Sequence, residues 1–239
     1  MKNHYNNNYN NYNQNYNKNI KAKKEKTIMK RKRDLTFDRE YLGNPILQFT
    51  KQNIGLDADI LGKIYEQIDN KLSHCPATYA MRFDVHMPKD LKVADNHLFS
   101  RFQAHFIKKE KRAGYDPSYV AVREESPQGG IHYHELLLLN GKKTERIGNH
   151  IKNANEALNS ALGYPPGTRS GLINNCTRDR NGKEQRNGIM IDSRSYTAGS
   201  REKDCFRQAS YLAKDSQKDD IAKGQHEIFS SRLKPINRA

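Results

Sequence analysis

The sequence contains no tryptophan, three cysteines and few apolar residues for its length. Of its 239 residues, 35% are apolar, and the mean hydropathy is −1.01. A chain of this composition is not expected to fill its whole length with packed core, so part of it should be unfolded. Cys75, Cys176 and Cys205 are odd in number and far apart. They suit a reducing compartment and indicate neither a disulfide framework nor a CxxC metal site.

A long hydrophobic run is also missing. The longest aliphatic run is the four leucines at 136–139, and the N-terminus lacks the apolar core of a signal peptide. We therefore expect neither secretion nor membrane spanning, but a cytoplasmic protein. The G-x-x-x-x-G-K-[ST] pattern of a P-loop is absent too, which predicts no nucleotide-driven motor of that kind in this chain.

Positive charge, in contrast, is in excess. The chain has 42 Lys and Arg against 27 Asp and Glu, a formal charge of +15. A protein this basic is attracted to polyanions, and without an amphipathic basic helix nucleic acid is a better candidate than a membrane surface. The alternative is that the excess charge only keeps the protein soluble.

Residues 1–33 combine low complexity with basic charge. Residues 1–19 are almost entirely Asn and Tyr, and residues 20–33 contain eight Lys or Arg and one Glu. Such a segment buries too little apolar surface to offset its ordering entropy, which predicts a disordered arm. Its last residues are predicted to contact nucleic-acid phosphates, although a tail that only adds solubility is the alternative: Lys30, Arg31, Lys32 and Arg33. Residues 34–56 are interpreted as a linker or extension.

From residue 57 the hydrophobic periodicity becomes regular. Helical spacing predicts helices over 56–72, 95–113 (capped by Asp95), 147–162 and 203–216. Strands are predicted at 78–88, in a hairpin over 119–140, and at 171–173 and 188–192. Together they predict one α+β domain over 57–235, with a central antiparallel sheet of about five strands interleaved with helices.

The predicted strand at 78–88 alternates strictly between apolar and polar residues, as a half-buried strand does. Arg82, Asp84 and His86 share its polar face. Arg82 is predicted to contact nucleic acid. A solvated sheet edge explains Asp84 and His86 as well as a functional role does.

Two histidines stand one residue apart in the second strand of the hairpin, in "GGIHYHELLLLNG". Successive strand residues point to opposite faces, so His132 and His134 share one face. Across the turn, Glu124 can lie near His132, and Glu125 is the alternative. Two imidazoles and a carboxylate form a facial set for Mn²⁺, Mg²⁺ or Zn²⁺ that leaves coordination positions open. Polar residues on the solvated side of a strand are the plainer explanation.

The last predicted helix places Tyr211, Lys214 and Lys218 at i, i+3 and i+7, on the side opposite Phe206 and its apolar neighbours. Lys218 is predicted to contact nucleic acid. An exposed tyrosine usually has no special role. Beside a metal-bound phosphate it can act as a nucleophile, with a nearby cation favouring the phenolate.

The His132-Tyr133-His134 motif before an apolar strand, followed downstream by Tyr211-Leu212-Ala213-Lys214, resembles the HUH superfamily of rolling-circle replication initiators and relaxases. Over roughly residues 57–220, the chain looks most like the replication proteins of filamentous phages (inoviruses). The resemblance implies an RRM/ferredoxin-like HUH core. It also implies that His132, His134 and Glu124 bind the metal, with Tyr211 as nucleophile and Lys214 as its helper.

The resemblance further implies metal-assisted nicking of single-stranded DNA or an origin hairpin. The products would be a 5′-phosphotyrosine link and a free 3′-hydroxyl that primes replication, with Mn²⁺ or Mg²⁺ favoured over Zn²⁺. A host helicase and polymerase would then be partners. Two alternatives remain: a non-catalytic DNA- or RNA-binding module of phage or prophage origin, and a metal hydrolase that activates water and forms no adduct.

Overall fold

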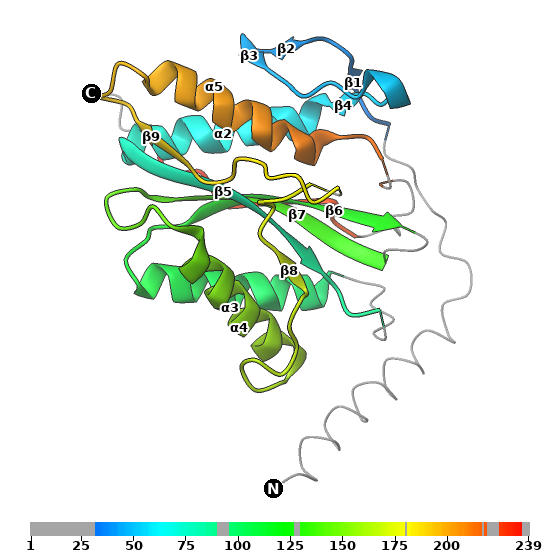
Figure 1. The fold of residues 1–239 in the computed structure, drawn as a ribbon, viewed down its shortest axis with the longest axis vertical. Coiled ribbons are helices and arrows are strands. Elements are labelled where there is room, and N and C mark those ends of the chain that lie inside the picture. The colour runs from blue at the N-terminus through cyan, green and yellow to red at the C-terminus, as the bar shows by residue number, and fades with distance from the viewer. Residues whose placement is uncertain are drawn as a thin grey trace, which may run out of the picture.

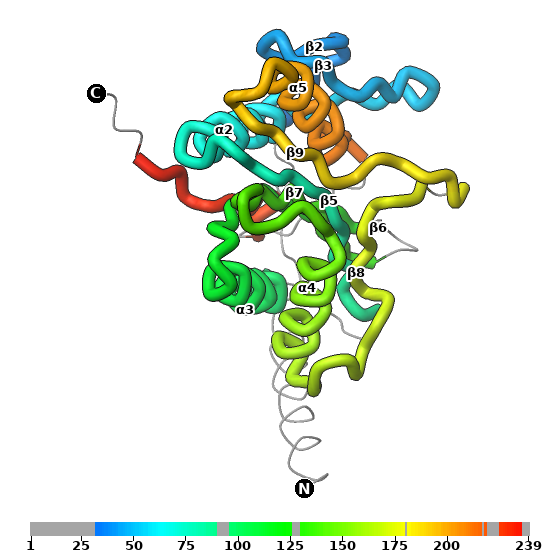
Figure 2. The backbone as a smooth tube through the Cα atoms, turned by 60° about the vertical axis from the view of Figure 1, so that its left-hand side comes forward, coloured from blue at the N-terminus to red at the C-terminus, as the bar shows by residue number. Residues whose placement is uncertain are grey.

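The computed structural model describes residues 32–89, 96–126, 130–179, 181–216, 218 and 225–235. Its centre is a six-stranded antiparallel sheet between two layers of helices (Figure 1). One face is covered by α2 (Ala58–His74) and α5 (Ala198–Ala209). The other is covered by α3 (His97–Arg112) and α4 (Ile147–Leu162), as the side view in Figure 2 shows. The predicted α+β class is confirmed.

The main sheet has the strand order β10-β6-β7-β5-β8, with β9 also paired to β5. The predicted hairpin is the β6–β7 pair, and the predicted strand at 78–88 is β5. β10 was not predicted, because three residues are too few to show a period. The strands are β5 (Ala77–His86), β6 (Ser118–Ser126), β7 (Gly130–Asn140), β8 (Ile173–Asn174), β9 (Ile189–Asp192) and β10 (Ile228–Ser230).

The central strands β5 and β7 are covered on both faces, so the prediction of a half-buried β5 is wrong. Met81 and Phe83 pack toward α3 and α4, while Ala80 on the opposite face packs toward α2 and α5. The consecutive leucines of β7 reflect the same burial, because successive residues enter different cores. On the α2/α5 face, β5 carries Arg82, Asp84 and His86 toward its C-terminal end, and the candidate site lies there.

Helix α2 begins where its sequence predicts. The Asp57 side chain caps it by accepting hydrogen bonds from the backbone N–H groups of Asp59 and Ile60. Helix α3 begins at His97, and the predicted cap Asp95 lies outside the described residues. No helix in the described ranges is long and apolar enough to cross a lipid bilayer.

The last helix differs from the prediction at both ends. Helix α5 begins at Ala198 and ends at Ala209, and a 3₁₀ turn, η2 (Ser210–Ala213), follows it. At Lys214 the backbone becomes extended (ψ 122°) and forms an isolated antiparallel bridge with Leu56. Pairing with a distant segment therefore ends the helix, and the predicted helical face does not reach Lys218.

Residues 35–57, here called the N-terminal extension, are folded against this turn. They contain β1 (Leu35–Thr36) paired with β4 (Leu56–Asp57), β2 (Glu40–Tyr41) paired with β3 (Asn44–Pro45), and the 3₁₀ turn η1 (Thr50–Gln52). Ile46 and Leu56 enter the core beneath α2 and α5. The backbone N–H of Leu47 donates to Ser210 Oγ at 2.9 Å. In Figure 1 the extension is the blue segment beside the end of α5.

Candidate metal centre and nucleophile

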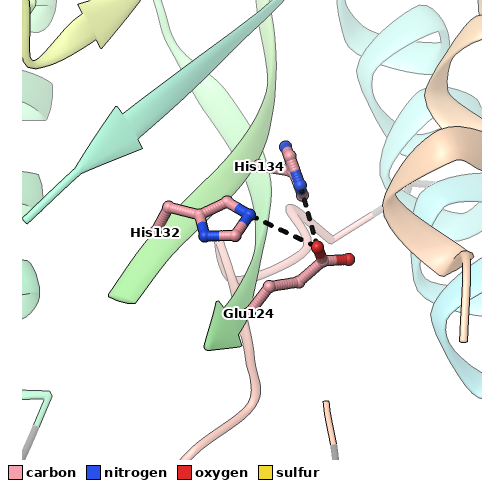
Figure 3. Close-up of side chains that lie close together, drawn as sticks. All are labelled: Glu124, His132 and His134. Carbon is pink, nitrogen blue, oxygen red and sulfur yellow. Dashed lines mark hydrogen bonds and ion pairs between the residues drawn. The ribbon is translucent and has the colours of Figure 1, made fainter. Parts of the chain in front are cut away.

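The hairpin brings Glu124, His132 and His134 together near its turn (Figure 3). Glu124 lies opposite His132 in the β6–β7 ladder, and His134 follows on the same face. Glu124 Oε2 lies 3.3 Å from His132 Nε2 and 3.2 Å from His134 Nε2. One potential ligand atom from each residue lies within 4.8 Å of the other two.

Glu125 does not join this cluster. It lies on the opposite face of β6, where its Oε2 is 3.1 Å from the Arg123 guanidinium. Because side chains alternate along a strand, only one of the two glutamates can face the histidines. The structure places Glu124, not Glu125, beside His132 and His134.

The cluster could hold a metal ion. Two imidazole nitrogens and a carboxylate oxygen converge on one point, a donor set that suits a divalent transition metal. Behind the cluster, His134 Nδ1 lies 2.6 Å from Asp84 Oδ1. A carboxylate that accepts a hydrogen bond from one ring nitrogen orients the other toward a metal, as in many metal-binding histidines.

The charges in the cluster support one another. Burial raises the pKa of Glu124, but hydrogen bonds with His132 and His134 and the charge of Lys218 hold that pKa well below its ordinary value. Burial lowers the pKa of His134, yet hydrogen bonds with Asp84 and Glu124 raise it above its ordinary value. A metal that binds His134 therefore competes with a proton that this environment holds more tightly than usual.

Lys218 is placed differently from the prediction. It is not on an exposed helix face, because its ammonium is buried and lies 2.9 Å from Glu124 Oε1. It also donates to the carbonyl of Lys214. Its place thus suits neutralising the second Glu124 oxygen, and this position does not support the predicted contact with DNA.

The tyrosine motif lies directly against the histidine motif. The Tyr211 ring packs edge-on against the His134 ring, with centroids 5.1 Å apart. The Arg82 guanidinium lies 4.5 Å from the Tyr211 centroid, and the Lys214 ammonium lies 5.1 Å from it. Arg82 also donates to the Gln208 carbonyl at 2.8 Å. Folding thus joins the two motifs in one site, and the roles predicted for their residues remain predictions.

A family model, the YagK/YfjJ C-terminal domain, matches residues 36–229. The chain belongs to the YagK/YfjJ C-terminal domain family. The matched residues include the whole candidate site and nearly all of the N-terminal extension. No curated protein matches the chain.

Two solved viral domains are distantly similar in structure to this YagK/YfjJ-family chain. The catalytic domain of the Rep protein of adeno-associated virus type 5 has a TM-score of 0.33 and 13% identity, covering 49% of this chain and 76% of its own. The N-terminal nuclease domain of non-structural protein 1 of minute virus of mice has a TM-score of 0.24 and 11% identity, covering 76% of this chain and 75% of its own. Likenesses this distant establish no activity.

Asp84 and His86 lie beside the histidine motif, although from the sequence a solvated sheet edge explained them equally well. Strand β5 is interior rather than an edge, and its register places Asp84 opposite His134 and His86 opposite His132. The rings of His86 and His132 stack with centroids 5.6 Å apart. Alternation along β5 had placed both residues on the Arg82 face. The sequence pattern did not show that this face of β5 lies beside the face of β7 that carries the histidines.

The basic residues at 30–33 divide into three cases. Lys30 and Arg31 lie outside the described residues, and Lys32 is exposed. The Arg33 guanidinium, in contrast, lies inside the YagK/YfjJ-family domain, 3.0 Å from Asp215 and 3.2 Å from Glu227. It is engaged by internal carboxylates, so its position does not support the predicted contact with a phosphate backbone.

Proposed function

We propose that this domain is a metal-dependent, single-strand DNA endonuclease of the HUH type that initiates replication, with Tyr211 as its nucleophile. The observation that carries the proposal is the contact between the Tyr211 and His134 rings, with centroids 5.1 Å apart. It joins a tyrosine from the 3₁₀ turn after α5 to the cluster of Glu124, His132 and His134, which could hold a metal. The inovirus-like motifs and the formal charge of +15 support a DNA substrate.

In the proposed reaction the Tyr211 oxygen attacks the scissile phosphorus. A new tyrosyl–phosphate ester forms as the bond to the 3′-oxygen breaks, and that oxygen leaves with a proton as a free 3′-hydroxyl. One ester replaces another, so no water is consumed and the strand can later be rejoined. Lys214 and Arg82, both close to the Tyr211 ring, favour the phenolate that attacks.

Glu124, His132 and His134 would hold the ion, which we propose to be Mn²⁺ or Mg²⁺, with Zn²⁺ as the alternative. A divalent cation held there would supply Lewis-acid chemistry, which stabilises negative charge on a phosphate in the transition state. Asp84 orients His134 through the 2.6 Å contact with Nδ1. Two host proteins are proposed as partners: a helicase, and a polymerase that would extend the 3′-hydroxyl.

The test is a nicking assay on single-stranded oligonucleotides tiled across the genetic element that encodes the chain. The full-length protein is incubated with Mn²⁺, Mg²⁺ or EDTA, and covalent adducts are resolved on denaturing gels. We expect a metal-dependent protein–DNA adduct that Tyr211→Phe abolishes. Tyr196→Phe is the matched control, because Tyr196 is fully exposed (101%) and should retain full adduct formation.

The other outcomes separate the rival functions. Metal-dependent cleavage without an adduct, unchanged in Tyr211→Phe, would assign the site to a hydrolase that activates water. Tight binding of the oligonucleotides without cleavage under any of the metals would favour a non-catalytic binding module.

A further inference from the structure

The N-terminal extension forms a hollow of about 230 Å³ beside the candidate nucleophile. This volume is smaller than the roughly 300–1,000 Å³ clefts that hold drug-sized ligands, and it suits a single ring system. The hollow is lined by Thr36, Phe37, Leu47, Gln48, Phe49, Thr50, Asn53, Ile54 and Leu56.

One wall of this hollow is shared with the nucleophile. The Phe49 ring, part of the lining, packs edge-on against the Tyr211 ring with centroids 6.1 Å apart. The Lys214 ammonium lies 5.6 Å from the Phe49 centroid. Phe49 therefore borders the hollow and also contacts the Tyr211 ring, with the Lys214 ammonium close to both rings.

Another lining residue, Phe37, presents an aromatic ring to solvent. Phe37 is 59% exposed, although a phenyl ring is costly to leave in water. Gly55 allows this placement, because a Cβ at that position would meet the Phe37 ring at 3.0 Å. The Gly55 carbonyl also accepts a hydrogen bond from the Asp215 backbone N–H at 3.0 Å, which links Gly55 to the segment after Tyr211.

The lining also carries hydrogen-bonding groups without negative charge. Thr50 and Asn53 are exposed, and their side chains make no hydrogen bond with the described part of the chain. None of the described lining residues is acidic. A second hollow that Phe37 also lines differs in this respect, because Asp34, Asp38 and Glu40 line it and would repel a phosphate.

We infer that the first hollow receives one base of single-stranded DNA, from a nucleotide next to the scissile phosphate. This inference rests on the proposed function and adds a base-recognition site to it. Phe37 and Phe49 supply ring surfaces for stacking, which every base accepts. Thr50 and Asn53 supply hydrogen bonds to a base edge. The hollow thereby positions the strand so that the adjoining phosphate lies at Tyr211.

The test separates base contacts from phosphate contacts. The probes are fluorescein-labelled dT15 and an abasic 15-mer with the same number of phosphates. Their Kd values are measured by fluorescence anisotropy with the full-length protein, in EDTA and at one fixed salt concentration. We expect Phe37→Ala to weaken dT15 binding about tenfold, within the range for one stacked base, and to leave abasic binding unchanged.

Two further variants keep the test interpretable. Leu42→Ala is the matched control, because Leu42 is 64% exposed and lines only the second hollow. It should change neither Kd. Phe37→Trp keeps an aromatic face and should bind dT15 within about twofold of the wild type. A Trp variant that binds as weakly as Phe37→Ala would overturn the inference, as would an equal loss of dT15 and abasic binding in Phe37→Ala.

Photocrosslinking locates the base directly. A dT15 probe with 5-iodouracil should crosslink to peptides within residues 36–56 of the wild-type protein. Crosslinks confined to other segments would overturn the inference.

Unchanged dT15 affinity in Phe37→Ala, alongside a Tyr211-dependent adduct, would refute the base site and leave the nuclease standing. Base-dependent binding lost in Phe37→Ala, without any adduct, would refute the nuclease alone.

Discussion

The candidate site is a row of polar side chains whose charges alternate. Asp84 contacts His134, His134 contacts Glu124, and Glu124 contacts Lys218, at 2.6, 3.2 and 2.9 Å. Each carboxylate thus lies beside a proton donor, which offsets the cost of burying it. The two flanking residues, Asp84 and Lys218, hold the predicted metal ligands in place.

Asp84 should therefore affect metal affinity without touching the metal. We expect Asp84→Ala to weaken Mn²⁺ binding about 10- to 100-fold, because His134 loses the group that orients its ring. Isothermal titration calorimetry on the full-length protein measures the change. Asp192→Ala is the matched control, since Asp192 belongs to the same sheet but pairs with exposed Arg194. Equal affinities for wild type and Asp84→Ala would contradict the expected role.

Glu135, on the opposite face of β7, is a buried carboxyl that accepts a hydrogen bond from the neutral side chain of Gln103. Burial raises its pKa well above the ordinary value of 4.5, although a hydrogen bond from Gln103 lowers it in part. The folded chain therefore binds this proton more tightly than the unfolded chain. The resulting stabilisation is complete below the ordinary pKa and is lost as pH rises toward the folded-state pKa.

Glu135→Gln should remove this pH dependence. Between pH 5 and pH 8 the wild type should lose more unfolding free energy than the variant, by about 1.4 kcal/mol per unit of pKa difference spanned. Urea unfolding at both pH values measures the two losses. Glu66→Gln serves as the exposed control and should behave as the wild type does. If Glu135→Gln and wild type lose stability in parallel, Glu135 is not protonated in the folded state.

At the scale of elements, the N-terminal extension packs against the segment that follows α5. Lys214 pairs with Leu56, the Asp215 backbone bonds to Gly55, and Phe49 contacts Tyr211. Arg33 ties the start of the extension to the same segment by donating to the Lys218 carbonyl at 2.7 Å. The position of Tyr211 thus depends on residues more than 150 positions earlier in the chain.

Arg33→Ala tests this tie. It removes the cation shared by Asp57, Asp215 and Glu227, and a buried carboxylate that loses its cation, as Asp57 would, is strongly destabilising. We expect a loss of about 3 kcal/mol in unfolding free energy, measured by urea denaturation. Lys32→Ala, at the exposed neighbour, should stay within about 0.5 kcal/mol of the wild type. A loss equally small in Arg33→Ala would show that the network contributes little.

For the whole molecule, the formal charge of +15 predicts that DNA binding depends steeply on salt. Each phosphate contact on a single strand contributes about −0.7 to the slope of log K against log salt. Replacing Lys30 and Arg31 together by Ser should make the slope for dT15 less negative by up to about 1.4 if both contact phosphates. Titration by fluorescence anisotropy between low and moderate salt measures it.

Lys63→Ser provides the control for this charge change, since Lys63 is paired with Glu66 on the exposed side of α2. It should leave the slope unchanged. If the double variant at 30 and 31 also kept the wild-type slope, the arm would contribute solubility alone.

Local pattern in the sequence was sufficient for several features. The period-two alternation of a strand places His132 and His134 on one face, and the short hairpin turn brings Glu124 opposite them. Helical spacing likewise located α2 and α4 closely, because their apolar residues repeat on one side. These features depend on residues near one another in the chain, so a local pattern is enough to predict them.

Only the tertiary structure decided which distant residues complete the site. Asp84 is 50 residues from His134, and Lys218 is 94 residues from Glu124. A local pattern shows which face a side chain occupies, but not which strand or segment lies beside that face. Pairing between distant segments depends on how the two cores pack as a whole. That packing makes β5 an interior strand, pairs Lys214 with Leu56 after the 3₁₀ turn and places Phe49 against Tyr211.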